Sequence, residues 1–150
     1  MSSLFVRDEI KDFFTTQIPT ETLIDLTAEF DELEDLVESA GITVDDPWVG
    51  IQFLAYEEIP VDILSTNDTG KYRENGTILI HIVDVAKKGG YSDILIRAEA
   101  IRDKFRGRRI GPILIEAVSP PNFGQGITLS FEGGYTAAVV SIEYKFDKIL

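Results

Sequence analysis

The chain has a single histidine, His81, which is the first side chain to weigh for chemistry. A general base needs an orienting partner within hydrogen-bond reach. The sequence places His81 between Ile80 and Ile82, inside an apolar run. We therefore expect a structural histidine, buried or partly buried. With one histidine and no cysteine, multi-histidine metal sites, thiolate zinc sites, cysteine nucleophiles and disulfides are excluded.

Carboxylates are abundant between residues 25 and 58, and a pair of them could act as general acid and base, as in glycosidases. No pair stands out from the rest, so an acidic surface facing solvent or a partner is the better interpretation. The runs Asp45–Asp46 and Asn67–Gly70 lack the spaced ligands of a calcium loop. The pairs Gly89–Gly90 and Gly124 with Gly126 lack the lysine and the strand–glycine–helix pattern of a phosphate loop. The sequence thus predicts no catalytic residue, no metal and no cofactor.

Arg106, Arg108 and Arg109 form the one basic cluster. Nucleic-acid contact is one hypothesis for it, but no aromatic residues are interleaved with the arginines. A contact with an acidic protein surface fits better, because arginine pairs well with carboxylates across interfaces. The alternative is a solvated helix end. The expected acidic counterpart lies at 25–46 of an adjacent copy or on another protein, with the candidates Glu32, Glu34 and Asp35.

Charge is unevenly distributed along the chain, whose net charge is -12. Residues 1–62 carry 16 acidic and 2 basic residues, for a net of -14, and residues 63–150 sum to +2. Surfaces of opposite charge allow copies of a chain to assemble head-to-tail, and such contacts close into a ring when the rotation between neighbouring copies permits it. The acidity opposes binding to nucleic acid and to anionic membranes. No apolar run has the length of a membrane span, and charge appears early at the N-terminus, so we expect a soluble intracellular protein.

The N-terminal part of the chain, up to residue 46, is expected to form two helices and a short strand. Helical spacing of Val6, Ile10, Phe13 and Phe14 predicts a helix over 4–16, stopped by Pro19. Residues 22–27 could form a short strand. Spacings of three and four predict an acidic helix over 29–39, ended by Gly41.

From residue 48 the period changes to two, which predicts a strand that ends at Glu57–Pro60. A second strand, 77–85, is apolar on both faces and should be central and covered on both sides. Ser92 should cap a helix that ends at Gly107 and buries Ile94, Ala98, Ile101 and Phe105. A strand over 110–118 and a hairpin of 127–132 with 135–146, turning at Gly133–Gly134, complete the chain.

Strands that come in runs, with helices between them, indicate an α+β fold. We expect one domain over 1–150, with a mixed or antiparallel β-sheet of about five strands and an N-terminal and a central helix packed on it. In the last strand, Val140, Ile142, Tyr144 and Phe146 should face the core.

In order and spacing, these elements resemble the tail-terminator (tail-completion) proteins of long-tailed bacteriophages. The resemblance spans nearly the whole chain. It rests on the helix Phe5–Phe14, the strand Trp48–Phe53, the run Tyr72–Ile82, the helical run Gly90–Phe105 and the terminal strand Tyr135–Phe146.

The resemblance implies a structural virion protein and not an enzyme. Such proteins form a homohexameric ring at the head-proximal end of the tail, assembled in the host cytoplasm. The ring would cap the tail tube protein, stop tube polymerisation and join a head-completion or stopper protein. DNA would pass through its lumen without specific binding, and no membrane would be involved. Two alternatives stay open: another head–tail joining protein (a stopper or a tube subunit), or a small acidic enzyme that uses a carboxylate pair.

Overall fold

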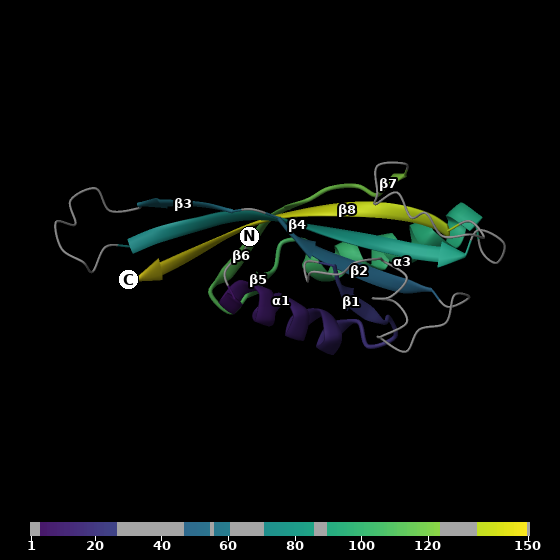
Figure 1. The fold of residues 1–150 in the computed structure, drawn as a ribbon, viewed down its shortest axis with the longest axis horizontal. Coiled ribbons are helices and arrows are strands. Elements are labelled where there is room, and N and C mark those ends of the chain that lie inside the picture. Colours follow the sequence, from purple (N-terminus) through teal and green to yellow (C-terminus); the bar gives the residue numbers. More distant parts are fainter. Residues whose placement is uncertain are drawn as a thin grey trace.

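The structure is a computed structural model that describes residues 4–26, 47–54, 56–60, 71–85, 90–123 and 135–149. Within these ranges two helices, α1 and α3, pack on one face of a single mixed sheet (Figure 1). The predicted α+β class, with an N-terminal and a central helix on the sheet, is confirmed. The described residues form eight strands, more than expected, because four short strands of two to four residues lie beside the longer ones. The face under the helices is called the helix face below, and the opposite one the outer face.

The sheet runs in the order β1-β2-β4-β8-β6-β5. Its strands are β1 (Leu23–Asp25), β2 (Trp48–Phe53), β4 (Lys71–Val85), β8 (Tyr135–Ile149), β6 (Ile113–Val118) and β5 (Arg109–Ile110). Two further strands lie off this path and pair with the central strands: β3 (Glu57–Pro60) pairs with β4, and β7 (Asn122–Phe123) pairs with β8. Among the described pairs, β1–β2 alone is parallel.

β4 and β8 form the long axis of the molecule. They are antiparallel and in register over 15 residues each, from Lys71 opposite Ile149 to Val85 opposite Tyr135. Figure 1 shows β3 and the adjoining ends of β4 and β8 projecting past the start of α1. We call this projection, residues 57–60, 71–76 and 144–149, the ribbon arm.

Helix α1 (Leu4–Gln17) presents the predicted apolar stripe to the sheet. Val6, Ile10 and Phe14 are fully buried, and Phe13 is partly buried against the same core. The helix ends two residues before Pro19, whose ring and missing N–H do not allow it to continue. Phe13 packs edge-on against Phe105 of α3, with ring centroids 5.1 Å apart, so the two helices meet through aromatic side chains.

Helix α3 (Gly90–Phe105) also buries its predicted stripe, Ile94, Ala98, Ile101 and Phe105. The predicted Ser92 cap is wrong, because the helix already begins at Gly90 and Ser92 lies in its first turn. The predicted end is confirmed. Gly107 has φ +66°, a left-handed conformation that glycine adopts at little cost and that closes helices.

Two strand predictions are corrected by the structure. Glu57–Pro60 does not simply end a strand; it forms β3, because β4 starts at Lys71, six residues before the predicted Thr77, and so offers a partner. The predicted single strand 110–118 is split into β5 and β6 by a turn at Gly111, which has φ +58°. The predicted helix 29–39, strand 127–132 and turn Gly133–Gly134 lie outside the described residues.

The central position of the strand 77–85 is confirmed, since β4 lies between β2 and β8. On the helix face, Ile78, Ile80 and Ile82 are fully buried, and on the outer face His81 and Val83 are buried as well. In β8, Val140, Ile142 and Tyr144 are buried on the helix face, as predicted, and Phe146 packs partly buried against the core.

Candidate protein interface

The basic cluster of Arg106, Arg108 and Arg109 is held on a fixed piece of backbone. Phe105, fully buried, anchors the end of α3, and Ile110, 6% exposed, anchors β5. Between these anchors, the Arg106 amide donates to the Arg102 carbonyl (2.8 Å) and the Arg108 amide to the Phe105 carbonyl (3.2 Å). All three arginine side chains are exposed. The local structure thus presents three cations at defined positions beyond the helix end.

The cluster differs from the other arginines of the chain in its pairing. Arg7, Arg73, Arg97 and Arg102 each form an ion pair with a carboxylate. Arg106, Arg108 and Arg109 form none with any residue that the structure describes. The predicted interface arginines are therefore exposed and available. The predicted acidic counterparts Glu32, Glu34 and Asp35 lie outside the described residues.

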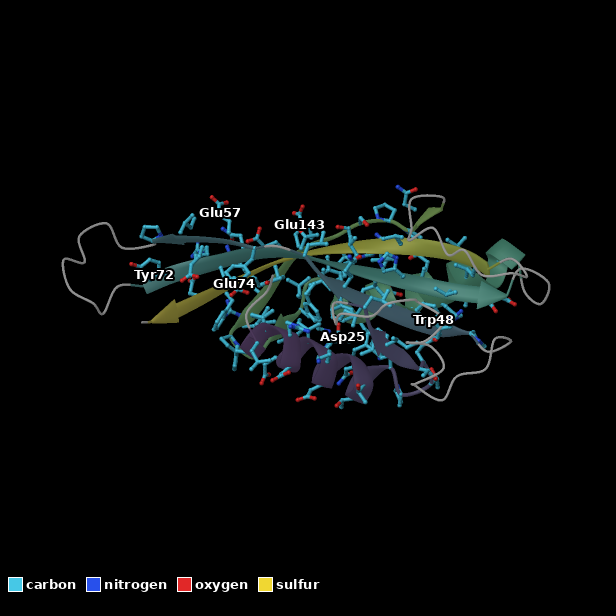
Figure 2. All side chains as sticks on the ribbon, in the orientation of Figure 1. Asp25, Trp48, Glu57, Tyr72, Glu74 and Glu143 are labelled. Carbon is cyan, nitrogen blue, oxygen red and sulfur yellow. The ribbon has the colours of Figure 1, made fainter. Side chains whose placement is uncertain are left out.

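A hollow of about 300 Å³ opens on the outer face at the root of the ribbon arm. Its wall carries three carboxylates, Glu57 on β3, Glu116 on β6 and Glu143 on β8. Asn75, Gly76, Thr77 and Tyr144 complete the lining. In Figure 2, Glu57 and Glu143 lie on the side of the sheet away from α1. Two cations act on the Glu116 carboxylate of the hollow: the Lys145 ammonium lies 3.7 Å from one of its oxygens, and the Arg73 guanidinium, paired with Asp147, interacts with it electrostatically.

His81 occupies a packed position on the outer face, as its sequence neighbours predicted. It is 3% exposed, and its Nε2 lies 3.2 Å from the Gln52 side-chain oxygen. Burial lowers the pKa of His81 to about 4, because desolvation disfavours the charged imidazolium. The ring is therefore neutral near pH 7, and the 3.2 Å separation is consistent with Nε2–H donating to Gln52.

Two polar networks could not be located from sequence. The Arg97 guanidinium on α3 binds both carboxylate oxygens of Glu21 (2.8 and 2.7 Å) and donates to the carbonyls of Val83 (3.0 Å) and Trp48 (3.3 Å). On the ribbon arm, the Tyr144 hydroxyl donates to the buried Glu74 carboxylate at 2.7 Å. The paired side chains lie 76 positions apart in the first network (Arg97 and Glu21) and 70 in the second (Tyr144 and Glu74), so the packing of the elements had to be known before either pair could be named.

Metal-binding chemistry finds no support in the described ranges: no group of three or more histidine, cysteine, aspartate or glutamate side chains there has a metal-holding arrangement. Within the same ranges, no helix has both the length and the apolar character needed to cross a membrane.

Comparison with known proteins identifies a shared fold but no family. No family model matches the chain, and no curated protein matches it in sequence. Among solved structures, 31 chains match it. One of them covers 93% of this chain and 94% of its own length, with a TM-score of 0.51 and 13% identity. Its name states no function, so the likeness supports the α+β fold alone.

Proposed function

We propose that this protein is a structural component of a phage virion, a tail terminator that forms a homohexameric ring at the head-proximal end of the tail. Support comes from the order of its elements, which resembles that family over nearly the whole chain. The α+β fold, with α1 and α3 on one face of a mixed sheet, is compatible with this proposal.

The observation that carries the proposal is the basic cluster. Three exposed arginines lack an ion pair within the described residues, in a chain of net charge -12 whose other four arginines are all paired. An isolated exposed pair would stabilise a contact by only about 0–1 kcal/mol, but a desolvated pair at an interface contributes more. Exposed arginines on an anchored stretch of backbone are suited to bind an acidic surface of a neighbouring subunit.

In this proposal the ring caps the polymerised tail tube protein and offers its other side to a head-completion or stopper protein. DNA passes through the lumen without adhering, since an acidic wall repels phosphates. The protein works in the virion after assembly in the host cytoplasm, with no cofactor and no catalytic step. Another head–tail joining role, as stopper or tube subunit, would use the same kind of surface.

Assembly of the purified full chain tests the proposal. Sedimentation velocity over a wide concentration range should show a concentration-dependent large species, and electron microscopy should show six-fold rings. Added to purified tails that lack this protein, the chain should decorate one end. A protein that stays monomeric and also fails to bind tail ends would overturn the proposal. A compact monomer or dimer with hydrolase activity would favour the enzyme alternative instead.

A further inference from the structure

The hollow on the outer face has the size and charge to accept basic side chains. Its volume of about 300 Å³ is at the lower end of the range for ligand pockets, so it has room for one or two side chains and little more. Its three carboxylates come from three different strands and are positioned by the pairing of the sheet. A guanidinium group, with its planar fork of donors, suits carboxylates held in this way.

The charge in the hollow is only partly balanced by the chain itself. Lys145 pairs with Glu116 at 3.7 Å, whereas Glu57 and Glu143 form no ion pair with any other described residue. All three glutamates are exposed, so no buried charge has to be explained. The hollow therefore presents net negative charge to whatever approaches the outer face.

The chain's own arginine cluster does not fill its own hollow. Strand register places Asn75, Lys145, Leu114 and Arg109 in one row across β4, β8, β6 and β5. Asn75, on the opposite side of the hollow, is three strand spacings from Arg109, or about 14 Å. Glu116, also in the lining, lies on β6 directly beside β5, but no ion pair joins it to Arg109. Arg109 alternates with the buried Ile110, so it points toward the outer face. The arginine cluster and the acidic hollow are therefore presented by the same chain, and no ion pair joins them within one copy.

From these observations we propose that the hollow is the docking site for Arg108 and Arg109 of a second copy of this chain. The contact rests on the assembly proposed above and specifies its surfaces. Glu57 and Glu143 receive the arginines, and Glu116, bridged to Lys145, forms the far wall. The second copy is favoured as occupant because the same chain carries the complementary cations, exposed and unpaired among its described residues.

Charge reversal and charge exchange test this contact, with assembly measured by sedimentation velocity. The first variant is Arg108→Glu with Arg109→Glu, and the second is Glu57→Arg with Glu143→Arg. Each should weaken self-association at least about 30-fold, the lower end of the loss expected when an interfacial charge pair is broken. The combined fourfold variant should recover most of the parent's association, because the exchanged charges attract again.

A matched control reverses two exposed acids elsewhere. Asp8→Arg with Asp12→Arg on α1 makes the same change in net charge as the second variant, but far from the hollow. It should leave association within a few-fold of the parent once salt is present. Circular dichroism checks the fold of every variant. Should the arginine substitutions at Glu57 and Glu143 prevent folding, Glu57→Gln with Glu143→Gln should fold and show a smaller loss in the same direction.

Each outcome discriminates between this contact and the proposed function. A parent that forms rings, with both double variants assembling equally well, overturns the contact and leaves the ring intact. If self-association is lost only in the Arg108→Glu, Arg109→Glu variant, the contact with the hollow is also overturned, and the arginines must bind another acidic surface or partner. If the parent forms only a dimer, and the two double variants lose this association while the fourfold variant recovers it, the contact is upheld and the ring is overturned. A parent that neither self-associates nor binds tail ends overturns both.

Discussion

Arg97 shows how single residues hold this fold together. Its side chain is 16% exposed, its partner Glu21 14%, and its guanidinium also caps two carbonyls at the ends of β2 and β4. A partly buried charge of this kind is tolerated because almost all of its donors are used. The network fixes α3 against the sheet at the end remote from the ribbon arm.

Replacing Arg97 by methionine should therefore be costly. Arg97→Met keeps most of the apolar stem but leaves the Glu21 carboxylate and two carbonyls without their donor. We expect the free energy of unfolding to fall by roughly 2–4 kcal/mol. Chemical denaturation measures it. The control is Arg73→Met, which breaks a more exposed pair with Asp147 (31% and 51% exposed) and should cost about 1 kcal/mol or less. Equal losses in the two variants would contradict the argument.

His81 couples stability to pH. Its pKa is lowered to about 4 in the folded protein, against about 6.5 when unfolded. Between these two values the unfolded chain binds more protons than the folded one, so stability is complete above about pH 6.5 and is lost as the pH falls toward 4. Over that window His81 should account for a loss of about 3 kcal/mol.

The comparison of His81→Gln with the parent isolates this contribution. The acidic residues titrate in both proteins, so their effects cancel in the difference. The parent's free energy of unfolding should drop more steeply than the variant's between pH 7 and pH 4, by up to about 3 kcal/mol. Denaturation curves at several pH values give the two slopes. Parallel slopes would mean that the folded imidazole titrates normally.

At the scale of elements, the ribbon arm depends on a close contact between a glycine and an aromatic ring. Gly76 on β4 lies opposite Tyr144 on β8, and the ring covers the space that a side chain at 76 would need. The same ring places its hydroxyl on Glu74, 2.7 Å away. Covering an exposed strand glycine with a cross-strand aromatic ring is a known way of fixing register.

Gly76→Ala should displace the Tyr144 ring. A methyl group at 76 would overlap the Tyr144 ring and hydroxyl, so the ring must move and its hydrogen bond to Glu74 must lengthen. We expect a loss of roughly 1–3 kcal/mol in unfolding free energy and a change in the near-ultraviolet circular dichroism of tyrosine. Gly107→Ala is the control: nothing lies within 4 Å of its added methyl group, so its cost of about 1 kcal/mol comes from φ +66° alone. Its near-ultraviolet spectrum should be unchanged.

Elements with a strong apolar period were predictable, and those defined by pairing were not. The stripes of α1 and α3 and the alternation in β8 appear in the sequence because each element buries one regular face, and β2 and β4 appear as apolar runs because they are buried on both faces. β3 carries no such signal: all four of its residues are exposed, and it is a strand only because β4 offers a partner. The break between β5 and β6 depends on one left-handed glycine, Gly111, whose conformation the apolar pattern does not reveal.

The candidate interface also has one part that could be predicted from the sequence and one that could not. The arginine cluster was identified from sequence because its three members lie within four positions, after an amphipathic helix. The hollow was not, because Glu57, Glu116 and Glu143 lie on three strands and are brought together only by the register of β3, β4, β8 and β6. In an acid-rich sequence, no single glutamate of the three stands out.

At the scale of the whole molecule, the net charge of -12 dominates the encounter with other polyanions. Affinity for duplex DNA grows with the number of phosphates neutralised by lysine and arginine, and it falls steeply with salt. The chain could offer Arg106, Arg108 and Arg109 as one local cation cluster, but the outer face that carries Arg109 also carries the three carboxylates of the hollow. Long-range repulsion should therefore exceed the local attraction.

We therefore expect no measurable binding to duplex DNA at about 150 mM salt, where nonspecific DNA-binding proteins typically bind in the micromolar to 100 micromolar range. Fluorescence anisotropy of a labelled duplex, read with the parent and with the Arg108→Glu, Arg109→Glu variant, measures this directly. A salt-dependent rise at low micromolar parent protein would contradict the prediction. If the rise then vanished in the variant, the arginines would be phosphate ligands. DNA would in that case adhere to this surface, and the assignment of the cluster to a protein neighbour would lose its basis.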